Sequence, residues 1–130
     1  MKTSRATAYG LLAAGYVAQH KEQGIILSQA VAKKYNIPLE YLLKIMQQLV
    51  RANILRSKRG PRGGFSLARP PAKITMLEII EAVEGPMSAS LGLEEHAPRD
   101  QFRTKTEQAY RKVVALTTDA LKKIKLSDLI

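Results

Sequence analysis

The chain has 130 residues, a length that fits one domain, and 45% of them are hydrophobic, which is enough for a core. Its 21 Lys and Arg side chains outnumber its 11 Asp and Glu side chains, and the formal net charge of +10 favours an acidic partner such as nucleic acid. The absence of cysteine excludes disulfide frameworks, cysteine–zinc sites and thiol sensors. No apolar run approaches the roughly 20 residues of a membrane span, and polar interruptions near the start argue against a signal peptide. We therefore expect a soluble, cytoplasmic protein.

Three helices are predicted in the first part of the chain. Apolar side chains at three- and four-residue spacing predict a helix over residues 3 to 20, capped by Thr3 or Ser4. A short second helix begins at Ser28, a good N-cap residue, and ends near Asn36. Pro38 fits the first turn of a third helix, whose apolar stripe consists of Leu42, Ile45, Met46, Leu49 and Val50. The polar residues on its other side are Glu40, Lys44, Gln47, Gln48 and Arg51. Two helices joined by a short turn in this way form a helix-turn-helix pattern.

A basic, glycine-rich segment follows the third helix. Residues 54 to 58 and 65 to 69 have the composition of β-strands, and the sequence RGPRGG between them is typical of a hairpin tip. A hairpin directly after a helix-turn-helix predicts a winged helix. Residues 33 to 73 hold ten cations and one acid, Glu40, which is nearly the whole net charge. We interpret this concentration of charge as a nucleic-acid surface. The alternative for the charge is a solvated basic face, and the alternative for the hairpin tip is a merely flexible turn.

The rest of the chain is expected to contain a capped helix, a loop and a long helix. Thr75 and Glu78 predict a capping box, Ile74 and Ile79 a hydrophobic staple, and Gly85 the end of that helix. Residues 87 to 100 have no period and are expected to form a mobile loop. From about 101 to 125, apolar residues again recur every three or four positions. The dimerisation candidates on this helix are Phe102, Ala109, Val113, Leu116, Ala120, Leu121 and Ile124.

The predicted fold is therefore mainly α with a small β-hairpin. We divide the chain into a winged helix-turn-helix domain (1–86), a loop (87–100) and a dimerisation helix with a C-terminal tail (101–130). The long helix has little domain left to pack on, so we expect a two-fold homodimer. The alternative is that this helix folds back on its own domain.

No catalytic or metal-binding constellation is found in the sequence. The chain has two His, no phosphate-cradling GxxxxGK loop and no carboxylate pair at a plausible site, so we do not expect an enzyme. His96 lies near Glu94, Glu95 and Asp100, but adjacent residues of a loop seldom converge on a metal ion. We therefore predict no metal site and no cofactor.

Three segments carry a resemblance to a known family. In chain order they are IPLEYLLKIMQQL (37–49), LRSKRGPRGGFSLARPP (55–71) and ITMLEIIEAVEGPM (74–87). They resemble the winged-helix transcriptional regulators typified by IscR, NsrR and CymR, the Rrf-two family, and the resemblance covers nearly the whole chain. It implies a homodimer, a recognition helix in the major groove of DNA, a wing in the adjacent minor groove and a long dimerisation helix. The residues that it assigns to DNA binding are Ser28, Gln29, Pro38, Leu39, Glu40, Tyr41, Lys44, Lys58, Arg59, Gly60, Arg62, Gly63 and Gly64.

The chain departs from the family in the loop before the long helix. Many relatives carry three cysteines there that hold an iron–sulfur cluster, whereas residues 91 to 101 contain none. We therefore predict a regulator without a cluster. Its effector is expected to be a small molecule or a protein partner lodged near Met87, Leu91 and Leu93, and the alternative is a constitutive binder controlled by its abundance.

The resulting hypothesis is a homodimeric, sequence-specific DNA-binding transcriptional regulator, most simply a repressor, that binds a near-palindromic operator. Glu40, Tyr41 and Lys44 are expected to read base edges while other cations contact phosphates. The alternative is a winged-helix module that binds RNA or a protein partner. Reading base edges from a helix favours DNA, because A-form RNA lacks a wide major groove.

Overall fold

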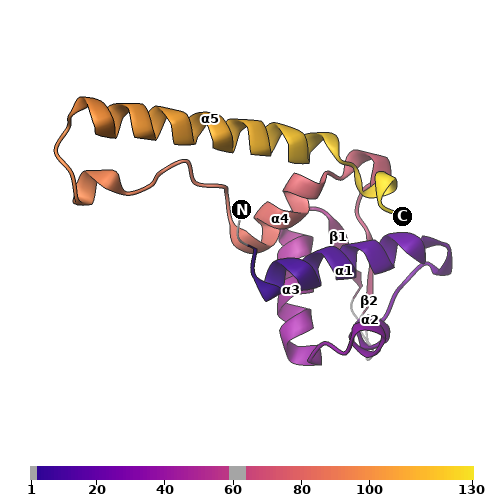
Figure 1. Ribbon diagram of the computed structural model, residues 1–130. Helices are drawn as coiled ribbons and strands as arrows, with labels where there is room; N and C mark the ends of the chain where they lie inside the picture. Colours follow the sequence, from indigo (N-terminus) through magenta and orange to yellow (C-terminus); the bar gives the residue numbers. More distant parts are fainter. Residues whose placement is uncertain (1–2, 59–63) are drawn as a thin grey trace.

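The expected winged helix with a long C-terminal helix is confirmed by a computed structural model, which describes residues 3–58 and 64–130 (Figure 1). In these residues the helices are α1 (Arg5–Gln19), α2 (Ser28–Tyr35), α3 (Leu39–Arg51), α4 (Met76–Glu84) and α5 (Gln101–Lys123). The strands are β1 (Leu55–Lys58) and β2 (Gly64–Leu67), and four short 3-10 turns complete the order: Lys21–Gln23, Pro71–Lys73, Leu93–Glu95 and Leu126–Asp128. None of the described helices has the length and apolarity needed to cross a bilayer.

The helix ends follow local capping chemistry, with three corrections to the expected caps. Ser4 caps α1 as predicted, because its hydroxyl accepts a hydrogen bond from the backbone N–H of Thr7. Ser28 does not cap α2: it is the first helical residue, and Leu27 occupies the N-cap position without a side-chain bond. Pro38 likewise precedes α3 as its N-cap instead of lying in the first turn. Its fixed φ suits a helix entry at either position.

The third correction concerns the start of α4. The hydroxyl of Thr75 accepts a hydrogen bond from the N–H of Glu78, which is one half of the predicted capping box. The other half is not formed, because the carboxylate of Glu78 pairs with the guanidinium of Arg69. Ile74 and Ile79 are both buried in one apolar cluster, as the staple requires.

One main core holds the winged domain together. Its largest buried side chains come from α1, α3 and the start of β1, and include Leu42, Met46, Leu49, Ile54 and Leu55. The predicted stripe on α3 is therefore the inner face of that helix. α1 and α4 pack so closely that a Cβ atom on Gly10 would lie 2.8 Å from Cγ2 of Val83.

The hairpin is bound to the domain through its second strand. β1 and β2 are antiparallel, with Leu55 opposite Leu67 and Lys58 opposite Gly64. On its outer edge Phe65 exchanges two backbone hydrogen bonds of 2.8 Å with Ile26, a residue of the segment between α1 and α2. β2 is therefore hydrogen-bonded on both edges, to β1 on one side and to Ile26 on the other.

The C-terminal tail packs on the winged domain. Ile124 accepts a backbone hydrogen bond of 2.9 Å from Met76, and Leu126 donates one of 2.8 Å to Ile74. Leu126 is buried in the main core. Residues 124–130 therefore belong structurally with the winged domain, whereas the expected division had grouped them with the long helix.

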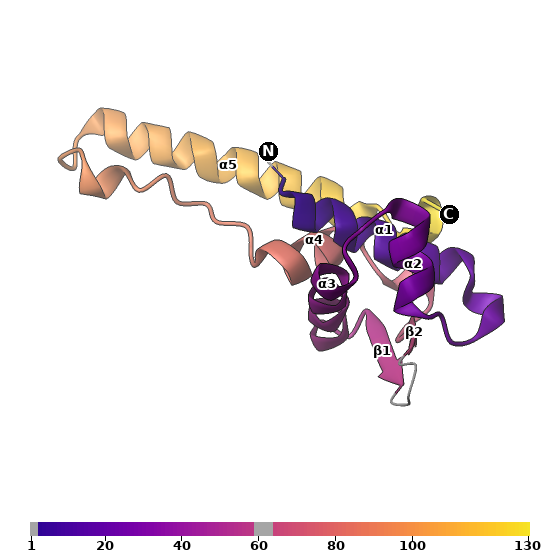
Figure 2. The same cartoon turned by 90° about the horizontal axis from the view of Figure 1, so that it is seen from below.

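α5 and the segment before it form an arm that extends away from the winged domain (Figures 1 and 2). Residues 87–100 run back along α5. The N–H of Met87 donates to the Glu81 carboxylate at 3.0 Å, and Arg103 of α5 donates to the carbonyl of Ala97 at 3.2 Å. This segment contains one 3-10 turn, and its predicted mobility stays a prediction. The C-terminal end of α5 packs on α4, where Leu121 contacts Leu77 and Ile80.

Candidate nucleic-acid interface

The outer face of α3 presents polar side chains to solvent. Glu40, Tyr41 and Lys44 are exposed, and the ring of Tyr41 meets the ring of Tyr9 edge-on, with centroids 5.6 Å apart and planes at 87°. Such edge-to-face pairs are favourable and directional. Tyr9 on α1 therefore supports Tyr41 from one side while 43% of the Tyr41 surface remains open.

A groove of about 690 Å³ runs along this face of α3. It is lined by Ala6, Pro38, Glu40, Tyr41, Lys44, Ile45, Gln48, Arg51 and Val83. The structure thus brings together four of the residues assigned to DNA binding, Pro38, Glu40, Tyr41 and Lys44. Leu39 is half-buried beside them. Their grouping follows from the apolar stripe on the other side of the helix, which fixes how α3 is rotated.

The start of α2 offers backbone hydrogen-bond donors. Ser28 and Gln29 are its first two residues, so their N–H groups have no carbonyl partner within the helix. The Ser28 side chain is buried and the Gln29 side chain is exposed. A contact to phosphate from these residues would therefore come from the backbone, in the way that helix N-termini bind anions.

The two cations of β1 lie on one face of the hairpin. Arg56 and Lys58 are two residues apart on β1, so their side chains point to the same side, and both are exposed. The assigned residues Arg59, Gly60, Arg62 and Gly63 lie outside the described residues.

Gly64, also assigned to DNA binding, has a packing role. A Cβ atom at this position would lie 2.1 Å from Cγ2 of Ile25. The glycine is therefore explained by its contact with the chain and does not need a DNA contact to account for it.

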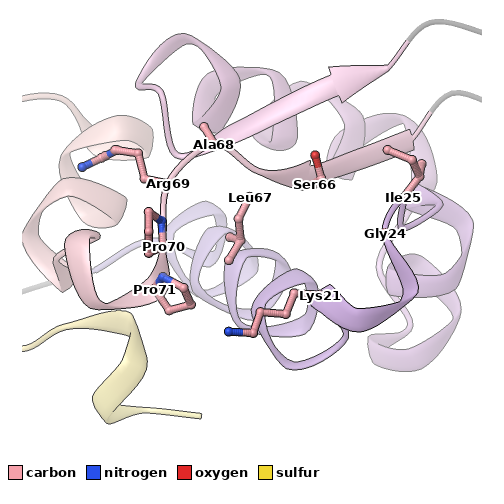
Figure 3. A pocket seen from close by; sticks show the side chains of 9 residues that line it. All are labelled: Lys21, Gly24, Ile25, Ser66, Leu67, Ala68, Arg69, Pro70 and Pro71. Atoms are coloured by element: carbon pink, nitrogen blue, oxygen red, sulfur yellow. The ribbon is translucent and has the colours of Figure 1, made fainter.

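Arg69 differs from the other cations of the basic segment that the structure describes. All three of its guanidinium nitrogens donate to groups within the chain: the carbonyls of Asn53 and Lys73 and the carboxylate of Glu78. It stands at the end of a second hollow, of about 580 Å³, between β2 and the turn after α1 (Figure 3). Lys21 and Leu67 line that hollow, whereas the Arg69 side chain is directed away from it.

Two different faces of α5 carry the residues proposed for dimerisation. Phe102, Val113 and Leu116 are 76%, 57% and 64% exposed, and they share one face with the exposed Ala109 and Ala120. Leu121 lies about 100° around the helix from Ala120 and is buried against α4. Ile124 lies just after the end of the helix, and its backbone carbonyl accepts a hydrogen bond from the N–H of Met76. We therefore correct the dimerisation set to the five exposed residues, which we call the α5 stripe.

The comparisons with known proteins agree with this geometry. Residues 3–130 match the model of the family described as "Rrf2: Iron-dependent Transcriptional regulator". The chain belongs to the Rrf2 (Rrf-two) family. CymR of Bacillus subtilis is 30% identical over 119 residues, which cover 91% of this chain and 86% of CymR. The solved structure of CymR, the global cysteine regulator of B. subtilis, superposes with a TM-score of 0.81 at 27% identity, over 99% of this chain and 95% of that one.

A more identical relative matches a shorter region. A protein of Aquifex aeolicus that bears the name "Putative HTH-type transcriptional regulator" is 41% identical over 73 residues, or 56% of this chain. That match spans half of the Aquifex protein's length. These relatives are transcriptional regulators and not enzymes.

The iron in the Rrf2 description has no matching donor set in this chain. Clusters of this kind are held by cysteine thiolates, and the chain has no cysteine. Within residues 3–58 and 64–130, no three His, Asp or Glu side chains gather where they could hold a metal ion. Asp100, near His96 in sequence, instead accepts a hydrogen bond of 2.9 Å from the N–H of Arg103 as the cap of α5. The residues present therefore do not fit the cluster, and no step of the proposed mechanism involves iron.

The sequence did not reveal two features near this interface. The Glu84 carboxylate at the end of α4 accepts hydrogen bonds from the hydroxyls of Ser4 and Thr7 at the start of α1. The three hydrogen bonds of the Arg69 guanidinium are also not predicted by the sequence, in which residues 65 to 69 have the composition of a β-strand. The sequence LARPP gave one usable signal: an arginine beside two prolines lies where the strand must end.

Proposed function

We propose that this chain is a homodimeric, sequence-specific DNA-binding transcriptional regulator, acting as a repressor in the cytoplasm, where it would meet DNA. The observation that carries the proposal is the exposed polar face of α3 beside the basic hairpin. α5 lies across the winged domain from the hairpin, so two chains that join through α5 would leave both α3 faces open (Figures 1 and 2).

In the proposed complex, α3 enters the major groove of DNA. Lys44 donates to acceptors on guanine, Tyr41 donates through its hydroxyl, and Glu40 accepts from a cytosine amino group. The Tyr9 ring restricts the orientations of Tyr41, which favours one base contact over several. The cations of β1 and the N–H groups at the start of α2 hold phosphates and set the register of α3.

The α5 stripe supports the homodimer. Its three large apolar side chains are more than half exposed, and they lie on a helix whose neighbouring face, about 100° around the axis, packs on its own chain through Leu121. A second copy is the partner that we propose for it, because an isologous contact repeats the same stripe on both sides. Two linked domains then read two half-sites of a near-palindromic operator, about one helical turn apart.

An effector of either kind, small molecule or protein, would act through the junction of α4 and α5. Met87, one of the residues expected near such a ligand, packs on the cluster of Leu77, Ile80 and Leu121 at this junction. A ligand that changes this packing moves the arm relative to α3. It thereby changes the separation of the two recognition helices and the affinity for DNA.

The test is a comparison of affinity for selected genomic fragments and for random duplex DNA. Lys44→Ala and Tyr41→Ala should lower the ratio of the two affinities roughly tenfold, the size of one lost base contact. Lys122→Ala removes an exposed cation of α5 and should leave this ratio unchanged. Equal losses on both kinds of DNA would show that these residues contact only the backbone. Absence of any wild-type binding would contradict the proposal.

A further inference from the structure

The side chain of Arg69 joins three separate segments of the winged domain. Its Nε donates to the carbonyl of Asn53 at 2.9 Å and its Nη1 to the carbonyl of Lys73 at 2.8 Å. Its Nη2 pairs with the carboxylate of Glu78. These acceptors belong to the turn after α3, to the 3-10 turn Pro71–Lys73 and to the first turn of α4.

One of these acceptors, the carbonyl of Asn53, lies where the hairpin begins. Asn53 has φ of 59°, and here the chain turns from α3 into β1. The next residue, Ile54, accepts a backbone hydrogen bond of 3.0 Å from Ala68, which immediately precedes Arg69. Both ends of the hairpin are therefore fastened at one place, directly beside the C-terminal end of α3.

The third acceptor connects this place to the arm. Glu78 lies in the first turn of α4, next to Leu77, which contacts Leu121 of α5. Arg69 thus connects the base of the hairpin, through its hydrogen bonds, to α4, the helix on which α5 packs.

We propose that Arg69 is a positioning residue for DNA recognition: it fixes the direction of the hairpin relative to α3, so that both elements reach adjacent grooves in one register. This proposal rests on the proposed function. An arginine suits the role because its planar guanidinium presents donors in several fixed directions, which a lysine ammonium does not. Direct contact with DNA is not the role that we assign, because each guanidinium nitrogen already donates within the chain.

The role differs from a contribution to stability alone. The Arg69 and Glu78 side chains are 28% and 38% exposed, and such an accessible ion pair contributes little stability by itself. The arrangement acts through geometry, because one rigid group sets the relative positions of three segments. Losing it should widen the range of hairpin orientations more than it lowers the melting temperature.

The absence of native cysteine allows a direct measurement of that range. Spin labels at Gln47→Cys on α3 and Ser57→Cys on β1, both exposed positions, report the distance between helix and hairpin. Arg69→Met should broaden the distance distribution, and Arg69→Lys should not restore it. Glu78→Ala removes one of the three acceptors and should give an intermediate width. Lys73→Met removes a neighbouring exposed cation but leaves the Lys73 carbonyl, and should change nothing.

A mutant cycle that measures DNA affinity supplies the functional readout. Arg69→Met should weaken binding to selected DNA roughly tenfold, the order expected from loss of a charge-assisted hydrogen bond. The further loss caused by Arg59→Ala with Arg62→Ala should be smaller in the Arg69→Met background than in the wild type. Unchanged distance distributions together with additive losses would overturn the proposal. A wild type that binds no DNA would refute the proposed function, while the spin-label distances would still decide whether Arg69 sets the hairpin direction.

Discussion

The side chain of Ile25 occupies the space that a side chain on Gly64 would need, since a Cβ atom there would lie 2.1 Å from Cγ2 of Ile25. The next residues along both segments, Ile26 and Phe65, are joined by two backbone hydrogen bonds. The entry to β2 is therefore packed against the turn before α2, and this contact ties the hairpin to the helix-turn-helix.

Gly64→Ala should consequently lower the free energy of unfolding by about 1–2 kcal/mol, because Ile25 must leave its present rotamer or the strand must shift. Ile25→Ala combined with Gly64→Ala should recover most of that loss, since it removes the obstructing methyl group. Gly15→Ala is the matched control. A Cβ atom there meets nothing within 4 Å, and the change should stabilise α1 by about 0.5–1 kcal/mol. Denaturant unfolding checks all three variants, and a neutral Gly64→Ala would show that the contact yields without cost.

A carboxylate joins the end of α4 to the start of α1 and makes stability depend on pH. The hydroxyl of Ser4, and next that of Thr7, donate to Glu84 and hold the pKa of its carboxyl below its ordinary value. The charged form is therefore favoured in the fold. The resulting stability is complete above the ordinary glutamate pKa and is lost as the pH falls through the lowered pKa of Glu84.

Glu84→Gln should therefore melt at a lower temperature than the wild type at neutral pH, and the difference should shrink as the pH falls through this window. Glu22→Gln, which removes an exposed carboxylate of the turn after α1, is the matched control. Its melting temperature should not show the loss at neutral pH that we expect for Glu84→Gln. Melting curves over a series of buffers decide the point. A difference between Glu84→Gln and wild type that stays constant down to acid pH would contradict the assignment.

The periodicity of the sequence was sufficient for the winged helix, because the stripes on α1 and α3 each belong to one buried face. Periodicity was insufficient for α5, because this helix has two adjacent apolar faces that the spacing of apolar residues does not separate. Ala120 lies on the exposed face, whereas the next residue, Leu121, is buried against α4. Long-range pairings were also hidden. Nothing local to Glu78 shows that its carboxylate turns to Arg69 and not back to its own helix start, and nothing local to Leu126 shows that it enters the core.

The α5 stripe should tolerate no charge at its centre. Val113→Asp would bury an unpaired carboxylate in the dimer, which costs several kcal/mol, so this variant should be monomeric at micromolar concentration. Ala115→Asp places the same charge at an exposed position on another side of the helix and should leave the dimer intact. Sedimentation velocity distinguishes these outcomes. A monomeric wild type, or a dimer that survives Val113→Asp, would refute this interface.

Binding to DNA should not require iron. The chain lacks thiolates, and thioethers and two His are a poor donor set for an iron–sulfur cluster. Anaerobically purified protein should be colourless, and treatment with an iron chelator should leave its affinity for selected DNA unchanged. Stoichiometric iron with visible absorption bands, together with loss of binding after chelation, would contradict this prediction.

The central claim is that two copies of α3 read a symmetric DNA site. Selection of bound fragments from a genomic or random duplex pool, followed by sequencing, tests it most directly. The wild type should enrich an inverted repeat whose half-sites are centred about one helical turn apart. The Tyr41→Ala and Lys44→Ala variants should each lose enrichment at defined positions within both half-sites. Enrichment of no sequence, or of a single half-site without symmetry, would contradict the claim.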